Sequence, residues 1–97
     1  MTVTRVQEGA MLTLIPHGRI DTVTAPIFEA ETDNLSGITE LIMDFSDIAY
    51  ISSAGLRVIL KSHKRMMRQG KMKLVNVGES VMEVLVLTGM TDILTIE

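Results

Sequence analysis

The sequence contains no cysteine and no tryptophan, has only 3% aromatic residues, and lacks any long uninterrupted apolar run. The absence of cysteine excludes disulfide scaffolds, thiolate catalysis and Cys-ligated zinc or iron–sulfur sites. No apolar run approaches the roughly 18 residues that a membrane-spanning helix needs. The N-terminal residues also lack the basic-then-apolar order of a signal peptide. We therefore expect a protein without membrane insertion that stays in the cytoplasm.

The remaining composition is that of an ordinary folded chain. Apolar residues make up 46% of the 97 residues, charged residues make up 22%, and the formal net charge is −3. This balance argues against disorder. The length predicts one domain over residues 1–97, with enough buried surface for a core of its own.

Apolar runs and helix-period segments alternate along the chain. The first two runs, over 3–7 and 10–17, are separated by Glu8-Gly9 and predict an N-terminal hairpin. Later segments predict helices beginning near Pro26, at Ser52-Ser53 and near Ser80, and strands over 41–45, 72–77 and 93–96. The resulting order β-β-α-β-α-β-α-β predicts an α/β fold with a single mixed, mostly parallel sheet. The nearly continuous apolar run over 41–45 is typical of a strand covered on both faces.

The middle helix is predicted to be strongly amphipathic, and Gly70 is expected to end it as a C′ glycine. Its apolar residues fall within an arc of roughly 120° and its basic residues within another of roughly 100°. The apolar arc consists of Leu56, Ile59, Leu60, His63, Met66 and Met67, and the basic arc of Arg57, Lys61, Lys64, Arg65 and Arg68. Seven of the nine basic residues lie between Arg57 and Lys73, and no acid occurs from residue 48 to 78.

A basic helix face of this kind has three interpretations. It is most often a solvated surface, it can bind nucleic-acid phosphates, or it can meet an acidic protein partner. The chain as a whole is acidic and shows no helix-turn-helix or zinc module, which argues against direct binding of nucleic acid. The shortage of aromatic side chains argues against single-stranded nucleic acid as well, because such binding uses aromatic stacking.

Residues for metal binding or catalysis are few. Only His17 and His63 supply imidazole, and His63 falls on the apolar arc, so we expect no metal site. No glycine-rich phosphate loop and no Gly-x-Ser-x-Gly elbow is present. Because no nucleophile, base and orienting group can be identified together, we expect no cofactor and no enzymatic activity.

The segment Ser52-Ser53-Ala54-Gly55 stands out at the start of the middle helix. Serine is a good N-cap residue, so one interpretation is simple capping of the helix. Ala54 and Gly55, however, are small for a first helical turn, and glycine weakens a helix by roughly 1 kcal/mol relative to alanine. The second interpretation is that small neighbours leave a serine hydroxyl open to another protein.

Three segments of the chain resemble the STAS domain, and most closely the small single-domain anti-sigma factor antagonists of bacteria. The stretch over 42–60, IMDFSDIAYISSAGLRVIL, resembles the central signature of that family. Gly18-Arg19-Ile20-Asp21 resembles its Gly-x-hydrophobic-Asp signature, and Gly89-Met90-Thr91-Asp92-Ile93 its turn before the last strand. The segments follow one another in the family's order and span most of the chain.

The resemblance implies a phosphorylation switch. In such antagonists a serine at the start of this helix is phosphorylated by a kinase that is itself the anti-sigma factor, and a serine phosphatase resets it. Aligned on Gly55-Leu56, the acceptor position is Ser53, Ala54 takes the second hydroxyl position, and Ser52 replaces an aspartate. Because of that replacement, Ser52 is a second candidate acceptor one residue away.

The same resemblance implies a partner-binding surface around the acceptor. It includes Asp21, Ser52, Ala54, Gly55, Arg57, Lys61 and Lys64. Asp21 has an equally good interpretation as a helix cap before Thr22-Val23. Arg57, at i+4 from Ser53, is within reach of a phosphate there, and the basic residues suit an acidic kinase surface.

Two other functions stay open at this point. One is a STAS-type subunit of a transport or secretion-regulating assembly, in which the serine only packs. The other is a sensor that binds a nucleotide or another anion at the Ser52–Gly55 helix start.

Overall fold

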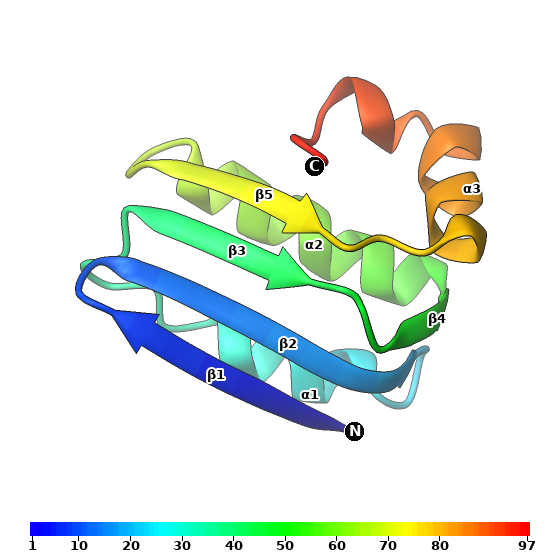
Figure 1. The fold of residues 1–97 in the computed structure, drawn as a ribbon, viewed down its shortest axis with the longest axis horizontal. Coiled ribbons are helices and arrows are strands. Elements are labelled where there is room, and N and C mark those ends of the chain that lie inside the picture. Colours follow the sequence, from blue (N-terminus) through cyan, green and yellow to red (C-terminus); the bar gives the residue numbers. More distant parts are fainter.

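The computed structural model describes residues 1–97 and contains one mixed sheet (Figure 1). Its strands are β1 (Thr2–Glu8), β2 (Met11–Ile20), β3 (Glu40–Asp44), β4 (Ile48–Ile51) and β5 (Lys71–Val75). β1 and β2 form an antiparallel hairpin, whereas β2–β3, β3–β5 and β2–β4 pair in parallel. The predicted α/β class, the N-terminal hairpin and the mostly parallel sheet are confirmed.

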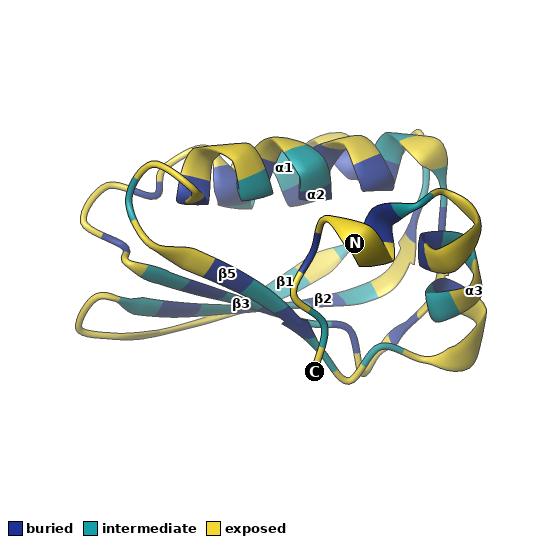
Figure 2. Cartoon of the chain, turned by 90° about the horizontal axis from the view of Figure 1, so that it is seen from above, coloured by how far each residue is buried: buried dark blue, intermediate teal, exposed yellow.

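The helices lie on one face and at one end of this sheet. They are α1 (Ala25–Thr32), α2 (Ser53–Met66) and α3 (Glu79–Leu87), followed by a short 3-10 turn over Met90–Asp92. Figure 2 shows α1 and α2 over the same face of the sheet, and Figure 1 shows α3 at the end near β4. None of the helices combines the length and the apolar character that crossing a membrane requires.

The core lies between the sheet and the helix pair. Burial alternates along the strands, so that Leu12 and Leu14 of β2 and Leu41 and Met43 of β3 are buried. These side chains belong to one cluster of 22 buried apolar residues that also includes the apolar side of α2. The alternation follows from the period of two in a strand with one covered face.

The expectation that residues 41–45 are covered on both faces is wrong. Ile42 is only half-buried, while Leu41 and Met43 are fully buried. The physical reason is that α1 and α2 pack on the same face of the sheet (Figure 2). Ile42 alternates with the buried Leu41 and Met43 and therefore belongs to the other face. Its neighbours in the sheet, Thr13 and Lys73, shield it only laterally.

Two strands differ from the predicted order. Residues 48–51 form β4, which pairs with the far end of β2, where Arg19 lies beside Tyr50 and Ile20 beside Ile51. The expected last strand over 93–96 is reduced to one parallel bridge between Leu74 and Ile96. The 3-10 turn over Met90–Asp92 precedes this segment, and its last bonds hold Ile93 and Leu94 to the Met90 carbonyl, so that only the backbone around Ile96 reaches the edge of β5.

The predicted amphipathic character of α2 is confirmed. All five residues of the basic arc are exposed, whereas Leu56, Ile59 and Met66 are buried and Met67 is exposed. The helix ends at Met66, earlier than the expected end near Gln69. Gly70 does not have the left-handed backbone of a C′ glycine. It is required for another reason, because a Cβ there would lie 1.9 Å from the Thr39 carbonyl oxygen.

Candidate functional site

The candidate site is the junction at which β4 continues into α2. Ser52 is the last extended residue, with φ −96° and ψ 176°, and α2 begins at Ser53. The Ser52 N–H donates to the Ile20 carbonyl at 2.8 Å, and the Ser52 carbonyl accepts from the Leu56 N–H at 3.0 Å. These two bonds fix the start of α2 to the end of β2.

The two serine hydroxyls lie in different surroundings. Ser53 is exposed, whereas the Ser52 Oγ atom is buried and has no hydrogen-bond partner in the protein. Neither forms the side-chain cap bond that a capping serine would make. Simple N-capping therefore does not account for this pair of serines, and Ser53 is the accessible one.

Gly55 has a structural role that differs from the sequence interpretation. It is buried, and a Cβ there would lie 2.6 Å from both Ile20 Cγ2 and Ile51 Cγ1. The small residue is therefore needed for α2 to approach the ends of β2 and β4. It does not serve to clear space around Ser53, and as a buried residue it offers no surface for a partner. Ala54 is half-buried beside it.

Asp21 lies where β2 ends, next to this junction. Its Oδ1 atom accepts hydrogen bonds from the Val23 and Thr24 N–H groups, each at 3.0 Å. The Thr24 backbone bond is the main cause that lowers the pKa of Asp21. Asp21 thus closes the turn over residues 22–24, and Thr24, not Asp21, is the N-cap residue of α1, so the interpretation of Asp21 as a helix cap is wrong in that respect. Because the Ser52 N–H bonds to the neighbouring Ile20, the structure also brings Asp21 close to the start of α2.

The three basic residues predicted to face a partner are exposed along α2 but differ in their contacts. Lys61 Nζ lies 3.1 Å from Glu29 Oε2 of α1 and is therefore already paired within the molecule. Arg57 and Lys64 form no ion pair or hydrogen bond with other side chains. Arg57 lies one turn after Ser53. Because its guanidinium has no partner, it can interact with a negative charge at the N-terminal end of α2.

Two exposed residues beside the junction, Arg19 and Tyr50, were not predicted from the sequence. The Arg19 guanidinium carbon lies 4.3 Å above the ring of Tyr50, and Arg19 Nε is 3.7 Å from Asp21 Oδ2. Arg19, Tyr50 and Asp21 thus form one rim beside the junction. Only the pairing of β2 with β4 reveals this rim, because Arg19 and Tyr50 are far apart in the sequence.

A hydroxyl, an imidazole and a carboxylate also come together, contrary to the sequence analysis. His17 Nε2 lies 2.7 Å from Thr4 Oγ1, and His17 Nδ1 lies 2.7 Å from Asp47 Oδ2. These side chains line none of the five main cavities of the molecule. No group of three or more His, Asp or Glu side chains is arranged to hold a metal ion.

Comparison with known proteins identifies the family. The sequence profile of the STAS domain matches residues 2–97, so the chain belongs to the STAS domain family. No curated protein sequence matches the chain significantly.

Solved structures share the fold over nearly the whole chain. An anti-sigma factor antagonist from Mycobacterium paratuberculosis superposes with a TM-score of 0.88 at 21% identity, covering 98% of this chain and 83% of that one. The unphosphorylated anti-sigma factor antagonist SpoIIAA gives a TM-score of 0.85 at 15% identity, with coverages of 99% and 88%. The phosphorylated form of the Bacillus cell fate determinant SpoIIAA gives 0.77 at 14% identity, with coverages of 99% and 91%. The similarity at these identities establishes the shared fold.

Proposed function

We propose that this protein is an anti-sigma factor antagonist, a binding protein without catalytic activity, whose hold on a serine kinase is switched by phosphorylation of Ser53. The observation that carries the proposal is the exposed Ser53 hydroxyl at the first position of α2, next to a buried Ser52 oxygen. Membership of the STAS family and the fold shared with both forms of SpoIIAA support it.

The start of α2 is electrostatically suited to a phosphate. A phosphoserine carries about −1.5 to −2 charges at neutral pH. The first turn of a helix leaves N–H groups without intrahelical acceptors, and the helix dipole is positive at this end. The first turn contains no acidic residue that would repel the group, and Arg57 is one turn away. Phosphorylation should therefore leave the fold intact.

The phosphate weakens the binding of this protein to the kinase. In the unmodified protein, the start of α2 presents a small, nearly neutral surface formed by Ser53 and Ala54. A phosphate buried there against a partner would lose its hydration, and the free energy of binding would become less favourable. Each loss of about 1.4 kcal/mol weakens binding about tenfold.

The exposed cations of α2 indicate that the partner carries an acidic surface. Arg57 and Lys64 carry free charges on the side of the molecule that continues from Ser53. We assign them to contacts with acidic groups on the kinase, with Lys61 contributing from its pair with Glu29. Such contacts raise the association rate and weaken as salt is added.

The cycle requires two partners in the cytoplasm. One is the kinase that serves as the anti-sigma factor and uses ATP to phosphorylate Ser53. The other is a serine phosphatase that removes the phosphate and restores binding.

Phosphosite mapping tests the proposal. The chain is incubated with ATP and a candidate anti-sigma factor kinase from the same organism, and the modified residue is identified by mass spectrometry. We expect phosphate on Ser53 in the wild type and in the Ser52→Ala variant, and none in Ser53→Ala. Equal phosphate incorporation into Ser53→Ala would contradict the proposal.

A further inference from the structure

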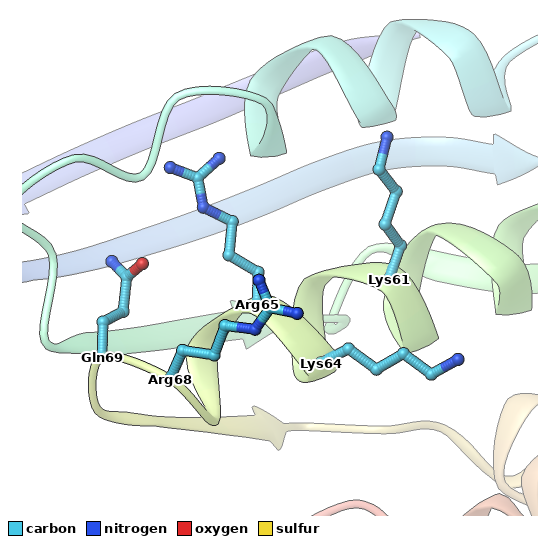
Figure 3. A pocket seen from close by; sticks show the side chains of 5 residues that line it. All are labelled: Lys61, Lys64, Arg65, Arg68 and Gln69. Carbon is cyan, nitrogen blue, oxygen red and sulfur yellow. The ribbon is translucent and has the colours of Figure 1, made fainter.

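A second charged site lies at the opposite end of α2 from Ser53. Lys61, Lys64, Arg65, Arg68 and Gln69 line a cavity of about 400 Å³ that we call the terminal pocket (Figure 3). Neither a carboxylate nor an apolar side chain is among the lining residues. In a protein whose formal net charge is −3, four cations around one cavity form a strong local concentration of positive charge.

The four cations line the same pocket because of their spacing. Residues 61, 64, 65 and 68 are related by steps of three and four, which place their side chains on one side of α2 and of the turn that continues it beyond Met66. The carbonyl end of α2 carries a partial charge of about −0.5, which stabilises these cations. Lys61 is paired with Glu29, and the charges of Lys64, Arg65 and Arg68 still outweigh this partial charge. The positive potential of the pocket is therefore built into the sequence of α2.

The wall of the terminal pocket is held in place by contacts to the segment after α1. Arg65 Nη1 donates to the Asp33 carbonyl at 2.7 Å. Gln69 Nε2 donates to the Leu35 carbonyl at 2.6 Å and to the Ile38 carbonyl at 2.7 Å. Lys61 Nζ is held by Glu29 Oε2 at 3.1 Å, with Asp33 Oδ1 at 4.0 Å. One side of the pocket is thus ordered before any ligand arrives.

The other side of the terminal pocket carries charges with no partner. Lys64 and Arg68 are exposed and form no ion pair or side-chain hydrogen bond. Arg65 uses one of its five N–H donors on Asp33, which leaves the others available. Ordered and free cations therefore surround the same space.

We propose that the terminal pocket binds a compact ligand that carries clustered phosphate groups. Two arginines supply planar donor pairs that match phosphate oxygens, and the lysines add point charges. The lining offers no aromatic ring for a base and no apolar surface for an acyl chain, so recognition is confined to the phosphates. Lys64, which the proposed function also assigns to the kinase-binding surface, is roughly 16 Å along the helix axis from Ser53. Phosphate binding in the terminal pocket does not depend on that function.

Calorimetric titration of the full chain with tripolyphosphate tests the assignment. We expect saturable binding that the Lys64→Gln/Arg68→Gln variant weakens at least about tenfold, because two charge-assisted contacts are lost. Both side chains are exposed and without partners, so this variant should fold normally, which its melting temperature checks. The matched control, Arg5→Gln/Lys73→Gln, removes the same charge elsewhere and should bind like the wild type.

Two further experiments, on vesicles and on poly-glutamate, distinguish a lipid headgroup from a soluble phosphate ligand and phosphate from carboxylate recognition. Binding to phosphatidylglycerol vesicles that tripolyphosphate displaces, and that the double variant loses, would assign the phosphates to a lipid headgroup. Absence of vesicle binding would assign them to a soluble ligand. The proposal is overturned if tripolyphosphate does not bind, if both double variants bind it equally, or if poly-glutamate competes as well as tripolyphosphate.

Discussion

At the scale of single residues, adjacent positions have separate physical roles. Ser53 faces solvent, Ser52 anchors the backbone of α2 to Ile20, and Gly55 lets α2 approach the sheet. The sequence placed all three at one helix start, because serine and glycine have distinct local preferences there. It did not reveal that Gly55 is buried, since Ile20 is far from it in the chain.

Gly55→Ala should destabilise the protein by about 1–3 kcal/mol, the usual result of overpacking a core. The new methyl group would lie 2.6 Å from atoms of Ile20 and Ile51, which are buried and β-branched and therefore yield little. Urea unfolding measures the change. Gly78→Ala, where a Cβ would meet no atom within 4 Å, is the matched control and should have a smaller effect. Equal stability of Gly55→Ala and the wild type would disprove this packing role.

At the scale of elements, α2 connects the candidate site at one end with the terminal pocket at the other. Its first turn has no acidic residue, so the dipole there is uncompensated. The turn that follows its last residue, Met66, is fastened to the segment after α1 through Gln69. The amphipathic pattern of α2 was readable from the sequence because the period of 3.6 is local. The hydrogen bonds of Gln69 to the Leu35 and Ile38 carbonyls could not be predicted from the sequence, because they join residues more than 30 positions apart.

Ser53→Asp should stabilise the protein by about 0.3–1 kcal/mol at low salt, because a negative charge at the N-terminus of α2 interacts favourably with the helix dipole. Thermal melting at low and high salt measures the effect, which added salt should reduce. Ser53→Ala controls for loss of the hydroxyl and should melt close to the wild type, since Ser53 makes no cap bond. A lower stability of Ser53→Asp would show that this helix start does not accept negative charge.

Gln69→Ala should lower the free energy of unfolding by about 1–3 kcal/mol, because two carbonyl groups in a part-buried setting lose their donor. The neighbouring Arg68→Ala should change stability by less than about 0.5 kcal/mol, as expected for an exposed side chain without partners. Chemical denaturation of both variants makes the comparison. If the two variants are equally stable, Gln69 does not fasten α2 to the segment after α1.

At the scale of the whole molecule, the order of elements was predictable and the long-range pairing was not. The hairpin, the sheet class and α2 follow from local periodicity and turn residues. The pairing of β4 with β2, the Arg19–Tyr50 contact and the Thr4–His17–Asp47 row depend on register between distant segments. The last strand was overpredicted for the same reason, because an apolar run does not reveal how much of it reaches the sheet edge.

The stability of the whole molecule should fall in acid. Hydrogen bonds from Thr24 and Val23 lower the pKa of Asp21. Burial raises the pKa of Asp44, but bonds from Ser46 and Asn76 outweigh it, so this pKa is also below the ordinary value of 3.8. Carboxylates with a lowered folded pKa contribute stability above the unfolded pKa, and this contribution is lost as the pH falls through the folded value.

Urea unfolding between about pH 5 and pH 2 should therefore show declining stability in the wild type. In the Asp21→Asn/Asp44→Asn variant the decline should be shallower, because two of the titrating groups are gone. An identical pH dependence in both proteins would mean that other carboxylates cause the acid transition.

The affinity of the candidate kinase for the unmodified and the Ser53-phosphorylated protein is the most direct measurement of the switch. Calorimetry with purified proteins should show that the phosphorylated form binds at least about tenfold more weakly, equivalent to about 1.4 kcal/mol. Circular dichroism should show the same fold in both forms, so that the loss arises at the interface. Equal affinity of the two forms for the kinase would contradict the account.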